Sequence, residues 1–338
     1  MMKETNNIAV LYEIHREATR YYQTYLQSKN AIEARQYLSG RKIDEDAIRV
    51  FSIGASSSEW DDLYQHLRGK GFSNDVLLES GLIGKSQSDR YYDRFRGRIM
   101  FPIHNVSGQV VGFTGRLYQD TDGSPKYLNS PESTIFKKRE TLYGLHISEQ
   151  WSQGVLILVE GTLDVIALRQ AGFCNVAAPL GTALTEEQFK LLAQHTKELI
   201  VCFDGDEAGE RATKRALDMA TNAGLKVRAV TMPQWCDPME FIQKYGAGAF
   251  SDLLIESQCP LAYELSVAEK AYTTETDERL IQFLQASAKI LVKAESTVAV
   301  DIHAGSIAKK YGISKDAMLA EVNYYRRRFA KECTDNEK

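Results

Sequence analysis

The strongest constraint on the fold is a pair of short apolar runs that each end in acidic residues. Val155–Val159 is followed directly by Glu160, and Leu199–Phe203 is followed by Asp204 and then by Asp206. Both runs are rich in Val, Ile and Leu. Runs of this length and composition are typical of strands that are buried on both faces of a sheet.

Helical patterns alternate with these strands. The first helical pattern ends at Gly172, and the second spans Ala208–Ala223 with Gly224 behind it, so both meet a glycine that suits a helix C-terminus. Between them, Asn175–Pro179 is expected to form a strand, and Thr185–Gln188 has the pattern of a capping box. This alternation predicts a parallel sheet with right-handed crossovers, which binds ligands at the carboxyl ends of its strands.

The acidic residues fall at those strand ends. Asp204 and Asp206 can point the same way from an extended segment, and Glu160 lies roughly 5 Å away if the two strands are neighbours. Asp164 can join them from the first turn of the following helix. Carboxylates this close repel one another unless a cation is present, and all-oxygen ligands suit Mg²⁺ or Mn²⁺. We therefore predict a divalent-metal site; the alternative, that each acid caps a helix, suits a single acid better than four.

Composition narrows the class of protein. The 338 residues carry a net charge of −4, so any nucleic-acid contact has to be local. The five cysteines are scattered without a C-x-x-C pair, so neither a zinc site nor a disulfide framework is expected. No apolar run reaches membrane-spanning length and no signal-peptide core is present, so we expect a cytoplasmic protein without a membrane partner.

One segment, residues 90–139, is locally basic, with nine Lys and Arg residues against four acids. Arg98–Ile103 and Gln109–Arg116 are expected to pair as strands around a turn at Asn105–Gly108, with Arg96 and Arg98 on one face. Such a surplus of positive charge favours binding of polyphosphate or nucleic acid. The alternative is a solvated charged face.

Two sets of motifs carry a family resemblance. Glu-Gly-X-X-Asp followed by Asp-X-Asp resembles the Toprim module of bacterial primases, topoisomerases, recombination proteins and some nucleases. Six further blocks occur in order and are spaced as in the RNA-polymerase domain of bacterial DnaG-type primases: DRFRGRIMFPI, GQVVGFTGR, PKYLNSPES-IFKKRETLYGL, VEGTLDVIALRQAG, LGTALT and FDGDEAGERA. The resemblance runs from about residue 7 to residue 246.

The resemblance implies synthesis of short RNA primers on single-stranded DNA by two-metal nucleotidyl transfer. It implies that the catalytic residues are Glu160, Asp204 and Asp206, and that two or more Mg²⁺ or Mn²⁺ ions are held by Glu160, Asp164, Asp204, Asp206 and Asp237. It implies that template and nucleotide are bound by Arg96, Arg98, Arg116, Lys126, Tyr127, Asn129, Lys137, Gly181 and Thr182. The implied partners are single-stranded DNA, nucleoside triphosphates and the nascent RNA, with a replicative helicase and a separate zinc-binding module as further candidates.

The sequence departs from the family in several places. Thr162 and Leu163 replace the Tyr-Met of the family's Glu-Gly-Tyr-Met-Asp, and Met239 replaces the second acid of Asp-Pro-Asp, with Glu240 next to it. The chain begins where the family's zinc ribbon would end, and it leaves no room for the helicase-docking domain. A trimmed chain and a naturally short relative from a mobile element both fit these ends.

We therefore expect an α/β fold, α+β overall, in three parts. These are an N-terminal basic α+β subdomain (1–148), a central Toprim subdomain with a parallel sheet (149–248) and a C-terminal helical bundle (249–338). Two alternative functions remain: a Toprim nuclease, and a catalytically weak accessory protein that binds single-stranded DNA.

Overall fold

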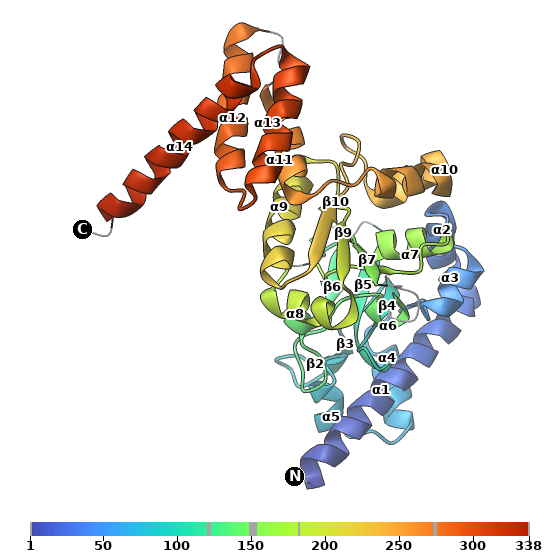
Figure 1. The fold of residues 1–338 in the computed structure, drawn as a ribbon. Helices are drawn as coiled ribbons and strands as arrows, with labels where there is room; N and C mark the ends of the chain where they lie inside the picture. Colours follow the sequence, from blue (N-terminus) through green and yellow to red (C-terminus); the bar gives the residue numbers. More distant parts are fainter. Residues whose placement is uncertain (1, 120–122, 149–153, 182, 273–275, 337–338) are drawn as a thin grey trace.

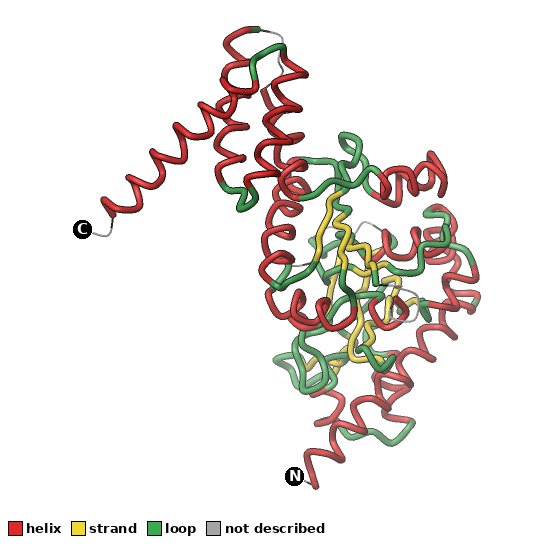
Figure 2. The backbone as a smooth tube through the Cα atoms, viewed as in Figure 1, coloured by secondary structure: helices red, strands yellow, loops and turns green. Residues whose placement is uncertain are grey.

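A computed structural model describes residues 2–119, 123–148, 154–181, 183–272 and 276–336. Strands lie in the middle of the molecule, helices surround them, and the last helices stand at one end (Figures 1 and 2). One sheet is parallel and another is antiparallel, so the predicted mixed α/β fold class is confirmed.

The N-terminal part builds the antiparallel sheet. Its strand order is β1-β4-β5-β6, and a separate hairpin joins β2 to β3. The predicted pairing of two strands around a turn is confirmed, with Arg98 opposite Leu117 across β4 and β5. The elements are α1 (Met2–Gln27), η1 (Lys29–Ala31), α2 (Ile32–Gly40), α3 (Glu45–Val50), β1 (Gly54–Ala55), α4 (Asp62–Gly69), α5 (Asn74–Glu79), β2 (Ile83–Lys85), β3 (Tyr91–Asp93), β4 (Arg98–His104), β5 (Val110–Leu117), β6 (Tyr127–Asn129), η2 (Lys138–Glu140) and α6 (Leu145–Ser148).

The central part builds the parallel sheet, in the order β10-β9-β7-β8. The two strands that precede the acidic residues are direct neighbours, with Leu158 of β7 opposite Val201 of β9. The expected strand at 175–179 is shorter than predicted, since only Val176 and Ala177 pair with β7. The elements are β7 (Val155–Leu158), α7 (Thr162–Gln170), β8 (Val176–Ala177), α8 (Glu186–His195), β9 (Glu198–Val201), α9 (Glu207–Asn222), β10 (Lys226–Ala229) and α10 (Pro238–Ile255).

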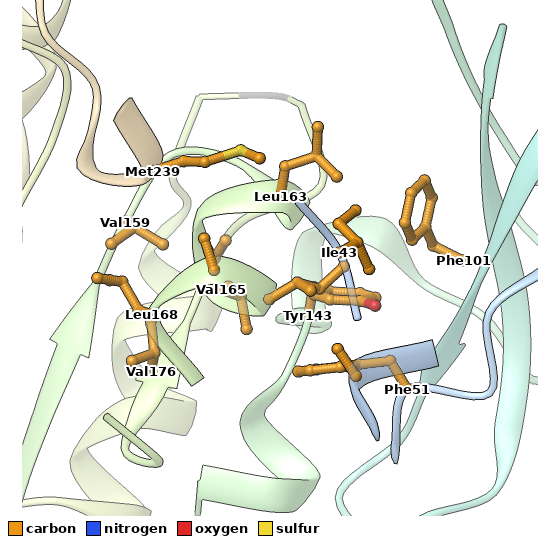
Figure 3. Packing of buried hydrophobic residues seen from close by; sticks show 14 of the residues in the cluster. Ile43, Phe51, Phe101, Tyr143, Val159, Leu163, Val165, Leu168, Val176 and Met239 are labelled. Atoms are coloured by element: carbon orange, nitrogen blue, oxygen red, sulfur yellow. The ribbon is translucent and has the colours of Figure 1, made fainter. Parts of the chain in front are cut away.

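Alternation along the strands places helices on both faces of the parallel sheet. Ile157 and Val159 belong to a core that includes residues of α7 and α10, whereas Leu156 and Leu158 belong to a core with α8 and α9. Successive side chains of a strand point to opposite faces, which is why every residue of the central strand β7 is apolar. The first of these cores also holds Phe101 of the antiparallel sheet, so the two sheets share buried side chains (Figure 3).

Four helices complete the chain: α11 (Pro260–Tyr272), α12 (Asp277–Val292), α13 (Thr297–Tyr311) and α14 (Lys315–Asn336). They form the predicted bundle around their own apolar core, and α14 projects away from the body (Figure 1). Gly246 interrupts α10 with φ of +83°. Within the described ranges, no helix has both the length and the apolar character needed to cross a membrane.

The strand pairing corrects one expectation about the basic segment. Arg96 does not share a strand face with Arg98, because β4 begins only at Arg98 and Gly97, with φ of +61°, turns the chain between them. The two guanidinium groups therefore have different surroundings.

Candidate active site

Two acids follow neighbouring strands at the carboxyl edge of the parallel sheet. Glu160 comes two residues after β7 and Asp204 three residues after β9. The Glu160 Oε1 atom accepts a hydrogen bond from the Asp204 backbone N–H at 3.1 Å. Glu160 and Asp204 are thus close to each other, as predicted.

Asp164 joins them from the first turn of α7. Its carboxylate accepts the backbone N–H of Gly161 at 3.0 Å and that of Met239 at 3.2 Å, which connects the β7–α7 turn to the start of α10. Burial raises the pKa of Asp164 well above its ordinary value, and the negative charges of Asp237 and Asp204 raise it further. Through these two hydrogen bonds, the buried Asp164 carboxyl holds the β7–α7 turn next to the start of α10.

The surroundings of Asp204 disfavour its negative charge. Burial, and then the charges of Glu160 and three further acids, raises the pKa of Asp204 to about 7. Its Oδ1 atom is buried and has no hydrogen-bond partner among the described residues. Burial also raises the pKa of Glu160, with a further contribution from Asp206. A hard divalent cation would relieve this repulsion, so the all-oxygen donor set fits the predicted metal.

Asp206 and Asp237 serve as helix N-caps. Asp206 accepts the Gly209 N–H at 2.7 Å at the start of α9, and Asp237 accepts the Glu240 N–H at 2.6 Å at the start of α10. Capping and metal binding are thus not exclusive alternatives at these positions, because one carboxylate has several lone pairs.

The carboxylates do not converge on one point. In the part of the chain that the structure describes, no three His, Cys, Asp or Glu side chains gather closely enough to hold an ion. The segment after β9 bends at Gly205, whose N–H and C=O bond to Cys236 and Trp235, so Asp204 and Asp206 do not extend side by side. The convergence of these two acids on one metal ion stays a prediction.

A cavity of about 960 Å³ opens over this edge of the sheet. Its acidic residues, here called the acidic wall, come from the central part of the chain, and its basic residues, here called the basic wall, come from the N-terminal part. The acids are Glu160, Asp164, Asp204, Asp237 and Glu240, and the cations are Arg41, Arg116, Lys126 and Lys138. Tyr127, Asn129 and Gly181 also line the cavity.

Aromatic rings position the basic wall. The Arg116 guanidinium lies 5.4 Å from the ring centre of Tyr37 and 4.9 Å from that of Tyr127, and Arg41 lies 5.8 Å from the Tyr37 ring on α2. In the ranges that the structure describes, the buried Arg116 Nε atom has no hydrogen-bond partner, and neither has the Oδ1 atom of Asn129. Such atoms are donors and acceptors that a bound ligand can satisfy.

Four of the predicted site residues do not line this cavity: Asp206, Arg96, Arg98 and Lys137. Arg98 is 4% exposed, and its Nη1 atom donates to the carbonyl oxygens of Gly115, Pro125 and Lys126. The Arg96 guanidinium carbon instead lies over two aromatic rings, 4.9 Å from the ring centre of Trp60 and 5.7 Å from that of Tyr92. Lys137 lies 3.8 Å from Glu140. Thr182, another predicted site residue, lies outside the described residues.

Sequence reasoning missed three contributors to these surfaces. Arg41 and Lys138 join the basic wall, and the half-exposed Trp60 provides the ring under Arg96. Arg41 follows Gly40 at a helix end. Nothing in that local pattern indicates that Arg41 shares a cavity with Arg116, which lies more than 70 residues further along the chain. Only the pairing of β5 with β6 brings Arg116 and Tyr127 toward it.

The fold and the site together define a Toprim-type catalytic core joined to an N-terminal basic module. Residues 21–149 match the family model of the DNA primase catalytic core, N-terminal domain, and residues 157–242 match the Toprim-like model. The chain belongs to the DnaG-type DNA primase family. Membership of this family implies the use of divalent metal ions in general.

The DNA primase of Clostridium acetobutylicum is 36% identical over 91% of this chain and 51% of its own length. That of Legionella pneumophila is 42% identical over 72% of this chain and 42% of its own length. The chain thus spans about half the length of the curated relatives it matches.

Solved structures agree with this assignment. A DnaG primase catalytic domain bound to single-stranded DNA has a TM-score of 0.74 at 31% identity, covering 90% of this chain and 99% of that one. The RNA polymerase domain of Mycobacterium tuberculosis DnaG in complex with double-stranded DNA has a TM-score of 0.82 at 30% identity. The match covers 90% of this chain and 98% of that one.

Proposed function

We propose that this protein is a DNA-directed RNA polymerase of the primase type, which synthesises short RNA primers on single-stranded DNA. The observation that carries the proposal is one cavity that is lined both by an acidic wall, including Glu160 and Asp204, and by a basic wall, including Arg116 and Lys126. A nucleoside triphosphate needs cations around its phosphates, and metal ions bound by carboxylates supply part of that charge. Homologous catalytic domains solved with DNA support the proposal.

The reaction joins two nucleotides. The 3′ oxygen of one attacks the α-phosphorus of the other, the bond from that phosphorus to the bridging oxygen breaks, and pyrophosphate leaves with the electron pair. The hydroxyl proton passes to the Glu160 carboxylate and from there to water. Glu160 lines the cavity, and in the metal-free protein burial raises its pKa.

The residues that would hold Mg²⁺ or Mn²⁺ are Glu160, Asp164, Asp204, Asp206 and Asp237. When bound, such ions neutralise the triphosphate and favour ionisation of the 3′-hydroxyl. Met239 is not among them, because a thioether is a poor ligand for a hard cation. Its side chain packs in the apolar core near Leu163 (Figure 3). Its backbone N–H instead holds the Asp164 carboxylate at 3.2 Å.

The basic wall would hold the incoming triphosphate. Arg116 carries its guanidinium between two tyrosine rings, which limits its freedom before the ligand arrives and so lowers the entropy lost on binding. Asn129, whose Nδ2 donates to the Leu180 carbonyl at 3.0 Å, leaves its oxygen for the nucleotide. Lys126 and Gly181, which line the same cavity, complete these contacts. Lys137 and Thr182 stay predicted nucleotide contacts.

The template would run over the surface where Arg96 stacks on Trp60. An exposed ring next to a guanidinium suits a base that stacks and a phosphate that pairs. A replicative helicase and a zinc-binding module remain proposed partners, and a cytoplasmic location stays a prediction.

The test is primer synthesis on single-stranded DNA with labelled nucleoside triphosphates and Mg²⁺ or Mn²⁺. Wild type is expected to produce short RNA, and Glu160→Gln is expected to lose at least about a hundredfold of that activity. Glu207→Gln is the matched control, since Glu207 is an exposed acid at the start of α9 that pairs with Arg211 at 3.6 Å. Degraded template, or equal products from wild type and Glu160→Gln, would contradict the proposal.

A further inference from the structure

Trp235, in the loop between β10 and α10, has an exposed side chain on a strained backbone. Its side chain is 73% exposed, compared with 51% for Trp60 on the proposed template surface. Its φ is +61°, in the left-handed region where a bulky side chain is an outlier. Neither burial of the indole nor a relaxed backbone therefore explains a tryptophan at this position.

The chain turns sharply at this residue. The Cys236 N–H donates to the Pro233 carbonyl at 3.1 Å, which closes a β-turn with Trp235 at its third position. Turns with a positive φ at that position normally carry glycine or asparagine there. Backbone strain of this kind is typical of functional sites, where the surrounding structure holds the residue in place.

Gly205 holds this turn beside the acidic residues. The Trp235 N–H donates to the Gly205 carbonyl at 2.9 Å, and the Gly205 N–H donates to the Cys236 carbonyl at 3.0 Å. A Cβ atom at Gly205 would lie 2.0 Å from the Pro233 carbonyl oxygen, so the contact leaves no space for a side chain. Because Gly205 follows Asp204, which lines the cavity of about 960 Å³, the exposed indole is carried on a fixed turn next to that cavity.

The neighbouring surface of α10 adds a cation and a second exposed ring. The Lys244 Nζ atom lies 5.0 Å from the ring centre of the half-exposed Tyr245. Burial and nearby acids raise the pKa of Cys236, and the positive charge of Lys244 lowers it, so Lys244 lies near the turn that carries Trp235. Exposed aromatic rings combined with a cation are typical of surfaces that bind single-stranded nucleic acid. We call Trp235, Lys244 and Tyr245 the α10 surface.

The α10 surface adjoins the basic wall. The Gln243 Nε2 atom donates to the Arg41 carbonyl at 3.0 Å, which joins α10 to the end of α2 (Figure 1). Arg41 lines the cavity, and so does Glu240 in the first turn of α10. A polynucleotide that leaves the cavity along α10 therefore meets the α10 surface.

Among the molecules that the proposed reaction brings together, the template is the one with a row of unpaired bases. The bases of the nascent RNA are paired with the template, and an incoming triphosphate needs more positive charge than one lysine supplies. We propose that the α10 surface binds the single-stranded DNA template beyond the cavity, with bases stacked on Trp235 and Tyr245 and a phosphate paired with Lys244. This inference rests on the proposed polymerase function and adds a second template contact to the one at Arg96 and Trp60.

Trp235→Gly separates this role from a structural one, because it is expected to change stability and binding in opposite directions. Removal of the backbone strain should raise the melting temperature by about 1–3 °C. Loss of the indole should weaken binding of a labelled single-stranded oligothymidylate by about tenfold. In primer synthesis it should raise KM for the template and leave KM for the nucleoside triphosphate within about twofold. Thermal melts, fluorescence anisotropy and steady-state kinetics measure these effects.

Further variants test the parts of the α10 surface. Trp235→Phe should recover part of the affinity, because it keeps a ring. Lys244→Gln should weaken binding by about twofold to fivefold and reduce its salt dependence. A duplex of the same length, whose bases are already stacked on one another, should bind wild type and Trp235→Gly equally.

Ser52→Gly is the matched control for the strain. Ser52 also has a positive φ, of +53°, but it is not among the residues that line the cavity. Its substitution should raise the melting temperature by a similar amount and leave binding of the oligothymidylate unchanged.

Wild-type affinity and template KM in Trp235→Gly would overturn the inference and leave the polymerase function intact, and so would an equal loss of affinity for the duplex. A Trp235→Gly protein that melts at a lower temperature and binds less, with no recovery in Trp235→Phe, would likewise overturn it. A wild-type protein that binds the oligothymidylate through Trp235 but makes no primer would support the inference and contradict the proposed function. A wild-type protein that binds no single-stranded DNA would overturn both.

Discussion

At the scale of single residues, the site concentrates negative charge without compensating it. Asp204 has a buried oxygen with no hydrogen-bond partner, and its pKa is raised to about 7 by burial and then by neighbouring acids. The native state therefore keeps a proton on Asp204 under conditions where the unfolded chain, with an ordinary pKa of about 3.9, has lost it.

This difference predicts how stability depends on pH in the metal-free protein. Stability is greatest below about pH 4 with respect to this group and falls as pH rises from about 4 to 7, because the native state binds more protons than the unfolded state in that window. Asp204→Asn removes the titration and should raise the melting temperature at pH 8 by about 2–4 °C in EDTA. Thermal melts at pH 5 and pH 8 measure the effect.

Asp218→Asn, at an exposed position of α9, is the control and should leave the melting temperature nearly unchanged. Addition of Mg²⁺ or Mn²⁺ at pH 8 should stabilise wild type more than Asp204→Asn. A lower melting temperature for Asp204→Asn than for wild type in EDTA at pH 8 would show that the charge is compensated.

The two arginines before and within β4 should respond differently to substitution. Arg98→Ala leaves the carbonyl oxygens of Gly115, Pro125 and Lys126 without their shared donor and should cost about 2–4 kcal/mol of unfolding free energy. Arg96→Ala should instead weaken binding of single-stranded DNA by about tenfold. Denaturant unfolding and fluorescence anisotropy separate the two effects.

Equal loss of DNA affinity with unchanged stability in both variants would place Arg98 on the nucleic-acid surface. That outcome would contradict its role as a buried bridge between β4, β5 and the segment before β6.

At the scale of elements, one glycine determines the path of α10. Gly246 has φ of +83° and ψ of 174°, a conformation that is essentially confined to glycine. Phe250, just beyond it, packs against Phe173 with ring centres 5.0 Å apart. The break thus lets the second half of α10 turn onto the core of the central region.

Gly246→Ala should destabilise the protein by about 1–3 kcal/mol, since a Cβ at this φ is strained although no atom stands within 4 Å of it. Gly248→Ala is the matched control two residues on, where φ is not positive and the space is also open. It should be neutral or stabilising by up to about 1 kcal/mol. Equal effects of the two substitutions in urea unfolding would rule out backbone strain at Gly246.

At the scale of the whole molecule, the apolar cores divide the chain unequally. One core extends from Leu26 to Phe250 and joins the antiparallel and parallel sheets, whereas Leu291 and its neighbours in α11–α14 form a separate core. Tyr263 of α11 packs in the core between the parallel sheet and α9, and so links the bundle to the sheet.

We expect the C-terminal bundle to open independently of the rest. In native-state hydrogen exchange, amides of α12 and α13 should exchange through a smaller opening free energy than those of β7 and β9. Leu291→Ala, which should cost about 2–5 kcal/mol in the bundle, should increase exchange there and leave β7 unchanged. Uniform acceleration across the chain would instead indicate one cooperative unit. The same experiment tests the boundary predicted near residue 249.

The sequence by itself determined the elements and their chemistry. Apolar runs that end in acids predicted β7 and β9 with Glu160 and Asp204 behind them, because a strand buried on both faces must be apolar throughout and can become polar only where it ends. The capping box at Thr185–Gln188 was likewise readable, because both of its hydrogen bonds lie within one helical turn.

Tertiary structure alone decided which charges meet. Arg41, Lys126 and Glu160 line one cavity only because strand pairing and a shared core bring distant segments together. Arg96 and Arg98 look equivalent in sequence, yet a positive φ at Gly97 sends one to an exposed aromatic surface and buries the other. Local patterns report hydrogen bonds and burial along a few residues, whereas a site is a set of long-range contacts that only the folded chain specifies.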